Sequence, residues 1–138
     1  MGTRLLMSVL TRRFNGGVLA ARRARRAVRD ELSGELPERT LDDVELLVSE
    51  LATNSVRHGG CDEDAELRVE TDVTPSCIRI RLCDTGSGFA EPRAEPSPPD
   101  AAGGFGLVLL DRISDRWGTQ RNGGFCVWFE VQRAPAAV

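Results

Sequence analysis

The chain has 138 residues, of which 41% are hydrophobic and 28% are charged, and its formal net charge is −3 at pH 7. This length and balance fit a single core, so we expect residues 1–138 to form one domain. Every basic side chain is an arginine, and the lack of lysine excludes a Walker-type phosphate loop and a Schiff-base enzyme. The only histidine, His58, excludes a zinc site built from several histidines.

The first elements are predicted to be a strand and a helix. The apolar run 5–10 is too short to span a membrane and is interpreted as the first strand. Asn15 is placed to cap a helix that runs through Val18, Val28 and Leu32.

Arginines crowd one face of that helix, where like charges four residues apart repel each other. A solvated face is the commoner explanation for such a run, and a surface for an acidic protein partner is the alternative. The overall acidity disfavours nucleic acid as the target. The arginines on this face are Arg22, Arg25, Arg26 and Arg29.

The most informative segment is residues 50–59, which lies on a helix for which Thr40 with Asp43 makes a capping-box-like start. Glu50, Asn54 and His58 are four residues apart, so a carboxylate, an amide and an imidazole line one stripe of a helix. Ser55 and apolar neighbours fill the packing positions around this stripe, which places it beside the core, where polar groups need partners. Exposed helix formers are the alternative interpretation.

A strand is predicted at 77–84, because apolar residues alternate with arginines along it. Asp84 continues the inward register, where a carboxylate is costly without a hydrogen-bond donor. Gly86 and Gly88 follow and would let a ligand approach the backbone closely. An ordinary Asp-containing turn is the simpler alternative, but it explains neither the register nor the second glycine.

A second glycine-rich segment, 103–107, opens a helical pattern that continues to residue 113. Unpaired backbone N–H groups at such a helix start form a phosphate site. The preceding segment, 91–102, is rich in proline, alanine and acidic residues and is interpreted as a mobile loop. With further strands at 66–73, 115–120 and 125–132, the order of elements predicts an α+β sandwich.

The cysteines lack the spacing of metal ligands, and Cys77 and Cys83 lie too far apart on one extended strand to form a disulfide. We therefore expect reduced thiols in a cytoplasmic protein. Trp117 and Trp128 are interpreted as sheet packing, and either could cover the second face of the sheet in a homodimer.

Together, the three polar or glycine-rich segments resemble the N, G1 and G2 boxes of the GHKL (Bergerat-fold) ATPases. The likeness is strongest to the anti-sigma-factor serine/threonine protein kinases of bacterial partner-switching systems, and it extends over nearly the whole chain. The resemblance implies a two-layer α/β sandwich with a mixed, mostly antiparallel sheet and helices on one face. It also implies an ATP lid over about residues 89–103.

The resemblance assigns roles to individual residues. Glu50 would be the catalytic base, Asn54 would ligate Mg²⁺, and Asp84 would accept a hydrogen bond from the adenine of ATP or ADP. Cys126 stands where the family usually has a threonine near the adenine. The residues implied to contact the nucleotide are Asn54, His58, Gly59, Asp84, Gly86, Gly88, Gly103, Gly104, Phe105, Gly106, Leu107 and Cys126.

The implied function is an anti-sigma factor that sequesters a sigma factor and phosphorylates a STAS-type anti-anti-sigma protein, without direct nucleic-acid or membrane binding. Two departures affect the kinase step: Ala101 and Ala102 precede the second glycine segment where a basic residue is usual, and Arg93 is the only basic residue of the lid. The alternative is a nucleotide-dependent protein-binding module that transfers no phosphate.

Overall fold

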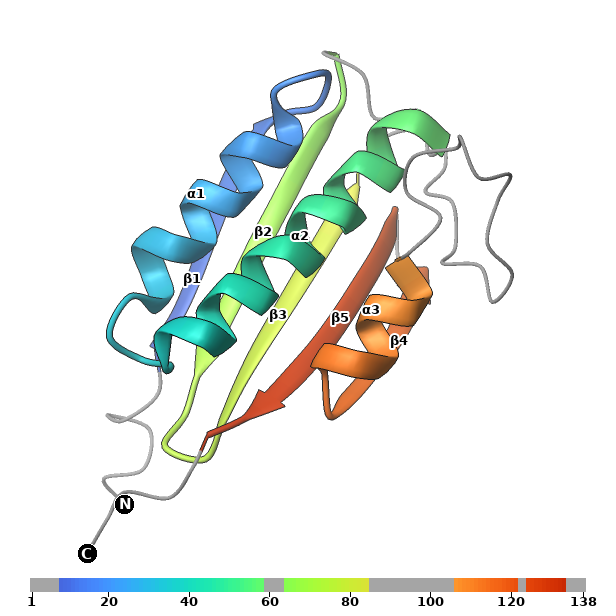
Figure 1. Ribbon diagram of the computed structural model, residues 1–138. Helices are drawn as coiled ribbons and strands as arrows, with labels where there is room; N and C mark the ends of the chain where they lie inside the picture. Colours follow the sequence, from blue (N-terminus) through green and yellow to red (C-terminus); the bar gives the residue numbers. More distant parts are fainter. Residues whose placement is uncertain (1–7, 59–63, 85–105, 122–123, 134–138) are drawn as a thin grey trace, which may run out of the picture.

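The computed structural model describes residues 8–58, 64–84, 106–121 and 124–133. Five strands form one sheet of order β1-β2-β3-β5-β4, and every described pairing is antiparallel. The three helices all lie on one face of this sheet (Figure 1), which confirms the predicted two-layer α+β sandwich. The elements are β1 (Ser8–Asn15), α1 (Ala20–Leu32), α2 (Glu38–His58), β2 (Glu66–Val73), β3 (Cys77–Asp84), α3 (Gly106–Ile113), β4 (Arg116–Arg121) and β5 (Phe125–Gln132).

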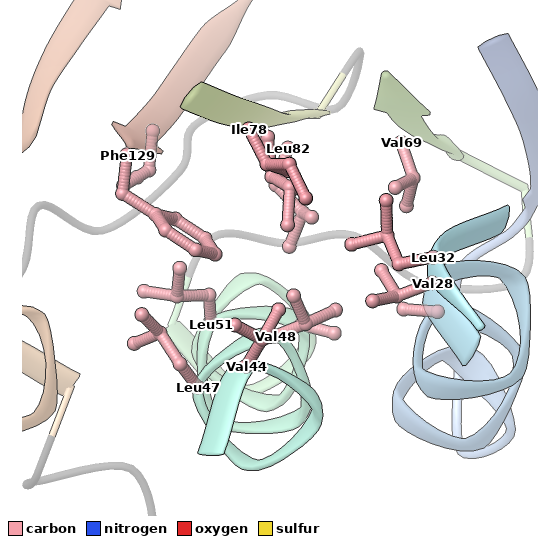
Figure 2. Packing of buried hydrophobic residues seen from close by; sticks show 14 of the residues in the cluster. Val28, Leu32, Val44, Leu47, Val48, Leu51, Val69, Ile78, Leu82 and Phe129 are labelled. Carbon is pink, nitrogen blue, oxygen red and sulfur yellow. The ribbon is translucent and has the colours of Figure 1, made fainter. Parts of the chain in front are cut away.

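The core lies between the helix layer and the sheet. Residues alternate between buried and half-buried along β2, and along β3 as far as Leu82, as expected for strands with one covered face. The covered face meets the apolar stripes of α1 and α2, and Phe129 of β5 closes the core beside them (Figure 2). Each fully buried side chain of this kind stabilises the fold by about 1.5–3 kcal/mol. The labelled core residues are Val28, Leu32, Val44, Leu47, Val48, Leu51, Val69, Ile78, Leu82 and Phe129.

Two predicted helix starts are wrong. Asn15 is the last residue of β1, where it pairs with Glu66, and α1 begins at Ala20 without any side-chain cap. Pairing with β2 prolongs the strand and overrides the local capping signal. Helix α2 begins at Glu38, directly after Pro37, so Thr40 lies inside its first turn and caps nothing.

Helices α1 and α2 form an antiparallel hairpin whose corner needs a glycine. Gly34 has φ +87°, in the left-handed region that other residues adopt only at a cost. Just before it, the Ser33 N–H donates to the Arg29 carbonyl and ends α1. Within the described residues, no helix is long and apolar enough to cross a membrane.

The sheet face away from the helices carries polar and aromatic side chains. Trp128 of β5 lies opposite Gly118 of β4, and the Arg79 guanidinium stacks 4.4 Å from the centre of the indole. Trp117, by contrast, packs partly buried against the core. Both tryptophans therefore take part in packing within this chain, as the sequence indicated.

Candidate functional site

The predicted polar stripe runs along the second half of α2. Glu50 is half-buried, whereas Asn54 is only 6% exposed. The side-chain oxygen of Asn54 accepts no hydrogen bond from the part of the chain that the structure describes. A buried amide oxygen without a donor is costly in a finished core, so this atom needs a partner from outside the described residues. His58 ends the helix, and its side chain lies outside the described residues.

Asp84 lies at the end of β3, on the same face as the buried apolar residues of that strand. Its carboxylate is 1% exposed, which confirms the predicted inward register. The hydroxyl of Ser55 donates a hydrogen bond of 2.9 Å to Asp84 Oδ2. This bond joins the residue next to Asn54 to the end of β3, and so α2 and β3 bring the amide and the carboxylate into one region of the helix-covered face.

Ser55 is the site residue that reasoning from the sequence missed. The apolar pattern correctly placed it among the packing positions of α2, and it is fully buried. A hydroxyl in such a position requires a hydrogen-bond partner. The partner is 29 positions away in the sequence, so its identity depends on the packing of α2 over β3.

Cys126 does not join this region. The register of β3 against β5 places Phe125 opposite Asp84 and Cys126 opposite Cys83. Because successive strand residues point to opposite faces, Cys126 faces away from the Asp84 carboxylate. The structure therefore does not support the predicted contact between Cys126 and the nucleotide.

The expectation of reduced thiols throughout is also wrong, because Cys83 and Cys126 form a disulfide with a Cα–Cα distance of 4.1 Å. Local sequence patterns do not indicate this pair, since it depends on the pairing of β3 with β5, which are not consecutive strands. Among the described residues Cys77 is a free thiol. Partial burial, and next the negative charge of Glu130, raise the pKa of this thiol above its ordinary value.

The predicted phosphate cradle is described only in part. Gly106 is the first residue of α3, and Leu107 follows it within the helix. The first turn of α3 has no acidic residue, so the positive end of its dipole is not neutralised by its own sequence. Helix α3 packs against α2, the helix that carries Asn54. Gly59, Gly86, Gly88, Gly103, Gly104 and Phe105 lie outside the described residues.

The sequence from residue 18 to residue 131 matches the family model described as a histidine kinase-like ATPase domain. The chain belongs to this ATPase family. The predicted GHKL membership is thereby confirmed, and membership in an ATPase family implies that the chain binds ATP.

Curated proteins that are similar to this chain in sequence are named serine-protein kinase RsbW. The protein from Listeria innocua is 34% identical over 86 residues, which cover 54% of this chain and 55% of the relative. The protein from Bacillus velezensis is 29% identical over 98 residues, which cover 63% of this chain and 61% of the relative. The aligned part of the chain thus spans little more than half the length of these relatives.

Solved structures agree on the fold. The RsbU and RsbW domains of a Mycobacterium tuberculosis protein superpose with a TM-score of 0.67 at 17% identity, covering 95% of this chain and 34% of that chain. A blue-light activated histidine kinase from Erythrobacter litoralis superposes with a TM-score of 0.56 at 19% identity, covering 82% of this chain and 41% of that chain. At these identities the likeness supports the histidine kinase-like ATPase fold alone.

Proposed function

We propose that this chain is an ATP-dependent serine/threonine protein kinase that acts as an anti-sigma factor in the bacterial cytoplasm. It would sequester a sigma factor and phosphorylate a STAS-type anti-anti-sigma protein. The observation that carries the proposal is the convergence of Asn54 and Asp84, joined through Ser55, on the helix-covered face of the sheet. The similarity to relatives named serine-protein kinase supports the proposed kinase activity.

Each residue has a role that its surroundings suit. Asp84 would accept a hydrogen bond from the adenine amino group, with its carboxylate held by the Ser55 hydroxyl. Glu50, one helical turn before Asn54, would take the proton from the attacking serine or threonine hydroxyl of the protein substrate. The backbone N–H groups at Gly106 and Leu107 would bind phosphate oxygens at the start of α3.

The donor set suits Mg²⁺. This ion prefers oxygen ligands and keeps several of its waters, and the buried Asn54 oxygen lacks a hydrogen-bond donor within the described residues. We propose that Asn54 holds the ion. When bound, Mg²⁺ would neutralise part of the charge on the transferring phosphate.

The alternative function is a nucleotide-dependent protein-binding module without phosphotransfer. Two alanines, Ala101 and Ala102, precede the second glycine segment, and the chain has no lysine that could reach a γ-phosphate. This composition is the specific observation that favours the alternative.

Glu50→Gln separates the two functions. If Glu50 is the base, the variant should bind ATP nearly as well as the parent but transfer phosphate about 10²–10⁴-fold more slowly. Asp43→Asn is a matched control, because it makes the same carboxylate-to-amide change at an exposed position of the same helix. Labelled ATP, Mg²⁺ and candidate STAS proteins are the reagents, and mass spectrometry locates any phosphate on serine or threonine.

Transfer by the parent and by Asp43→Asn, but not by Glu50→Gln, supports the kinase. A parent protein that binds ATP and a STAS partner, yet leaves that partner unmodified, contradicts the kinase and supports the binding module.

Two binding measurements test the individual roles by calorimetry. Asp84→Asn should weaken ATP and ADP binding by about 1.5–3 kcal/mol, the value of a hydrogen bond to a charged group. Asn54→Ala should lower ATP affinity mainly when Mg²⁺ is present, because it removes a metal ligand and leaves the adenine contact in place. Equal losses with and without Mg²⁺ would assign Asn54 to packing instead.

A further inference from the structure

Helix α1 presents a strongly cationic surface on an acidic protein. Its outward side carries four arginines, which with Asp30 and Glu45 line a hollow of about 480 Å³. We call the four the arginine face. They are Arg22, Arg25, Arg26 and Arg29.

The arginine face is unfavourable for the helix that carries it. Its members are three or four residues apart, a spacing at which like charges repel by about 0.2–0.5 kcal/mol per pair. The cations begin in the first turn of α1, which has no acidic residue to offset them, and positive charge at a helix N-terminus opposes the helix dipole. Residues that break local rules in this way are characteristic of functional sites.

Only one member of the arginine face, Arg29, forms ion pairs within the described part of the chain. Arg29 donates to Asp42 at 2.9 Å and to Glu38 at 3.3 Å, and it also forms an ion pair with Glu45. The hydrogen bond with Glu45 raises the pKa of Arg29, so this guanidinium remains charged. All three carboxylates belong to α2 and pair with Arg29 of α1, so these ion pairs join the two helices of the hairpin.

The other three members have no such partner. Arg22, Arg25 and Arg26 are exposed, and none forms an ion pair with a residue that the structure describes. Their planar guanidinium groups can bind carboxylates through two parallel hydrogen bonds. Exposed apolar side chains adjoin them at the start of the helix, where Val18 is 87% exposed and Leu19 is 43% exposed.

We propose that the arginine face is the docking surface for an acidic segment of a protein partner, whose carboxylates pair with Arg22, Arg25 and Arg26. Apolar side chains of the same segment would cover Val18 and Leu19. This proposal deepens the proposed function, because it names the surface and the chemistry by which a partner is captured.

A protein segment fits this surface better than a nucleic acid does. The three arginines without an ion-pair partner occupy little more than one turn of α1. Acidic side chains follow at the end of the same helix in Asp30 and Glu31, and at the start of α2 in Glu38. A duplex carries one charge per about 1.7 Å of its axis, so a bound duplex would also meet these carboxylates. A short acidic segment can end before them.

The test compares two double variants of the full chain. Arg22→Glu with Arg26→Glu reverses the arginine face, whereas Arg23→Glu with Arg39→Glu makes the same change of charge at exposed positions that do not line the hollow. The first variant places acids in the first turns of α1, where they favour the helix dipole, and it makes the 22/25 and 26/29 pairs opposite in charge. The repulsion between positions 22 and 26 keeps its size, so the free energy of unfolding should not fall. Loss of binding therefore cannot be ascribed to loss of the fold.

The probe is a fluorescein-labelled peptide of repeated Glu-Glu-Leu-Ala units, with a Gln-for-Glu peptide and a labelled DNA duplex as comparisons. Fluorescence anisotropy should show that the parent and the Arg23/Arg39 variant bind the acidic peptide, that added salt weakens this binding, and that the Arg22/Arg26 variant binds at least about tenfold more weakly. Candidate sigma-factor and STAS proteins, tested in the same assay, should follow the same order.

Equal binding of the acidic peptide by both variants would overturn the proposal, and so would preferential binding of the duplex to the arginine face. Equal capture of a sigma-factor or STAS protein by both variants would also overturn it. ATP binding and phosphotransfer are measured separately on the same proteins, so a failure of the kinase function is distinguishable from a failure of this surface.

Discussion

Opening the Cys83–Cys126 disulfide should cost this protein a large part of its stability. The two cysteines are 43 positions apart. In the chain-entropy model, closing a loop of that length lowers the entropy of the unfolded chain by an amount worth about 4 kcal/mol at 25 °C. Because domains are typically stable by about 5–15 kcal/mol in total, the loss should be obvious in a single denaturation curve.

The measurement is urea denaturation of the parent and of a Cys83→Ala/Cys126→Ala variant, each with and without dithiothreitol. We expect the reductant to destabilise the parent by about 4 kcal/mol and to leave the variant unchanged. Cys77→Ala is the matched control, since Cys77 is a free thiol and its removal should preserve the response to reductant. Mass spectrometry first verifies that the disulfide of the parent is formed. If its reduction then leaves the free energy of unfolding unchanged, the reasoning is refuted.

Three further substitutions probe single contacts. Ser55→Ala removes the 2.9 Å hydrogen bond to the buried Asp84 carboxylate and should destabilise the fold by about 1–3 kcal/mol in urea denaturation. Gly34→Ala meets no atom within 4 Å but keeps φ at +87°, so thermal unfolding should reveal a loss of about 1–2 kcal/mol from the backbone alone. Gly118→Ala would place a Cβ 2.8 Å from the Trp128 ring, and we expect a loss of about 1–3 kcal/mol with altered tryptophan fluorescence.

Each of these substitutions has an outcome that contradicts its explanation. Undiminished stability of Ser55→Ala would mean that the hydroxyl contributes nothing to holding Asp84. Gly34→Asn should lose less than Gly34→Ala, because asparagine tolerates the left-handed region, and the reverse order would argue against a backbone cause. Unchanged fluorescence of Gly118→Ala would show that the indole does not rest on that glycine.

Local periodicity sufficed to predict the parts of the site that lie on one element. The spacing of Glu50 and Asn54 defines a helical stripe, and the alternation through β3 places Asp84 on the inward face, without reference to any other segment. The period also located Ser55 in the core, although not its bond to Asp84.

The features that could not be predicted depend on which segments meet. The Cys83–Cys126 pair exists because β5 lies beside β3 in one particular register, and local patterns do not specify a register between strands far apart in the sequence. The failed capping prediction at Asn15 has the same cause, since pairing with β2 extends β1 through that residue. Pairing between distant strands thus determines both the disulfide and the end of β1, and local patterns predicted neither.

The strand order has a consequence for the route by which the chain folds. The hairpins β2–β3 and β4–β5 and the helical pair α1–α2 join neighbours in sequence, so they need little loop closure and can form early. The β1–β2 and β3–β5 pairings join distant segments and raise the contact order, which slows folding. We therefore expect three local units to assemble first and the central β3–β5 seam to close late, with core substitutions at that seam changing the unfolding rate more than the folding rate.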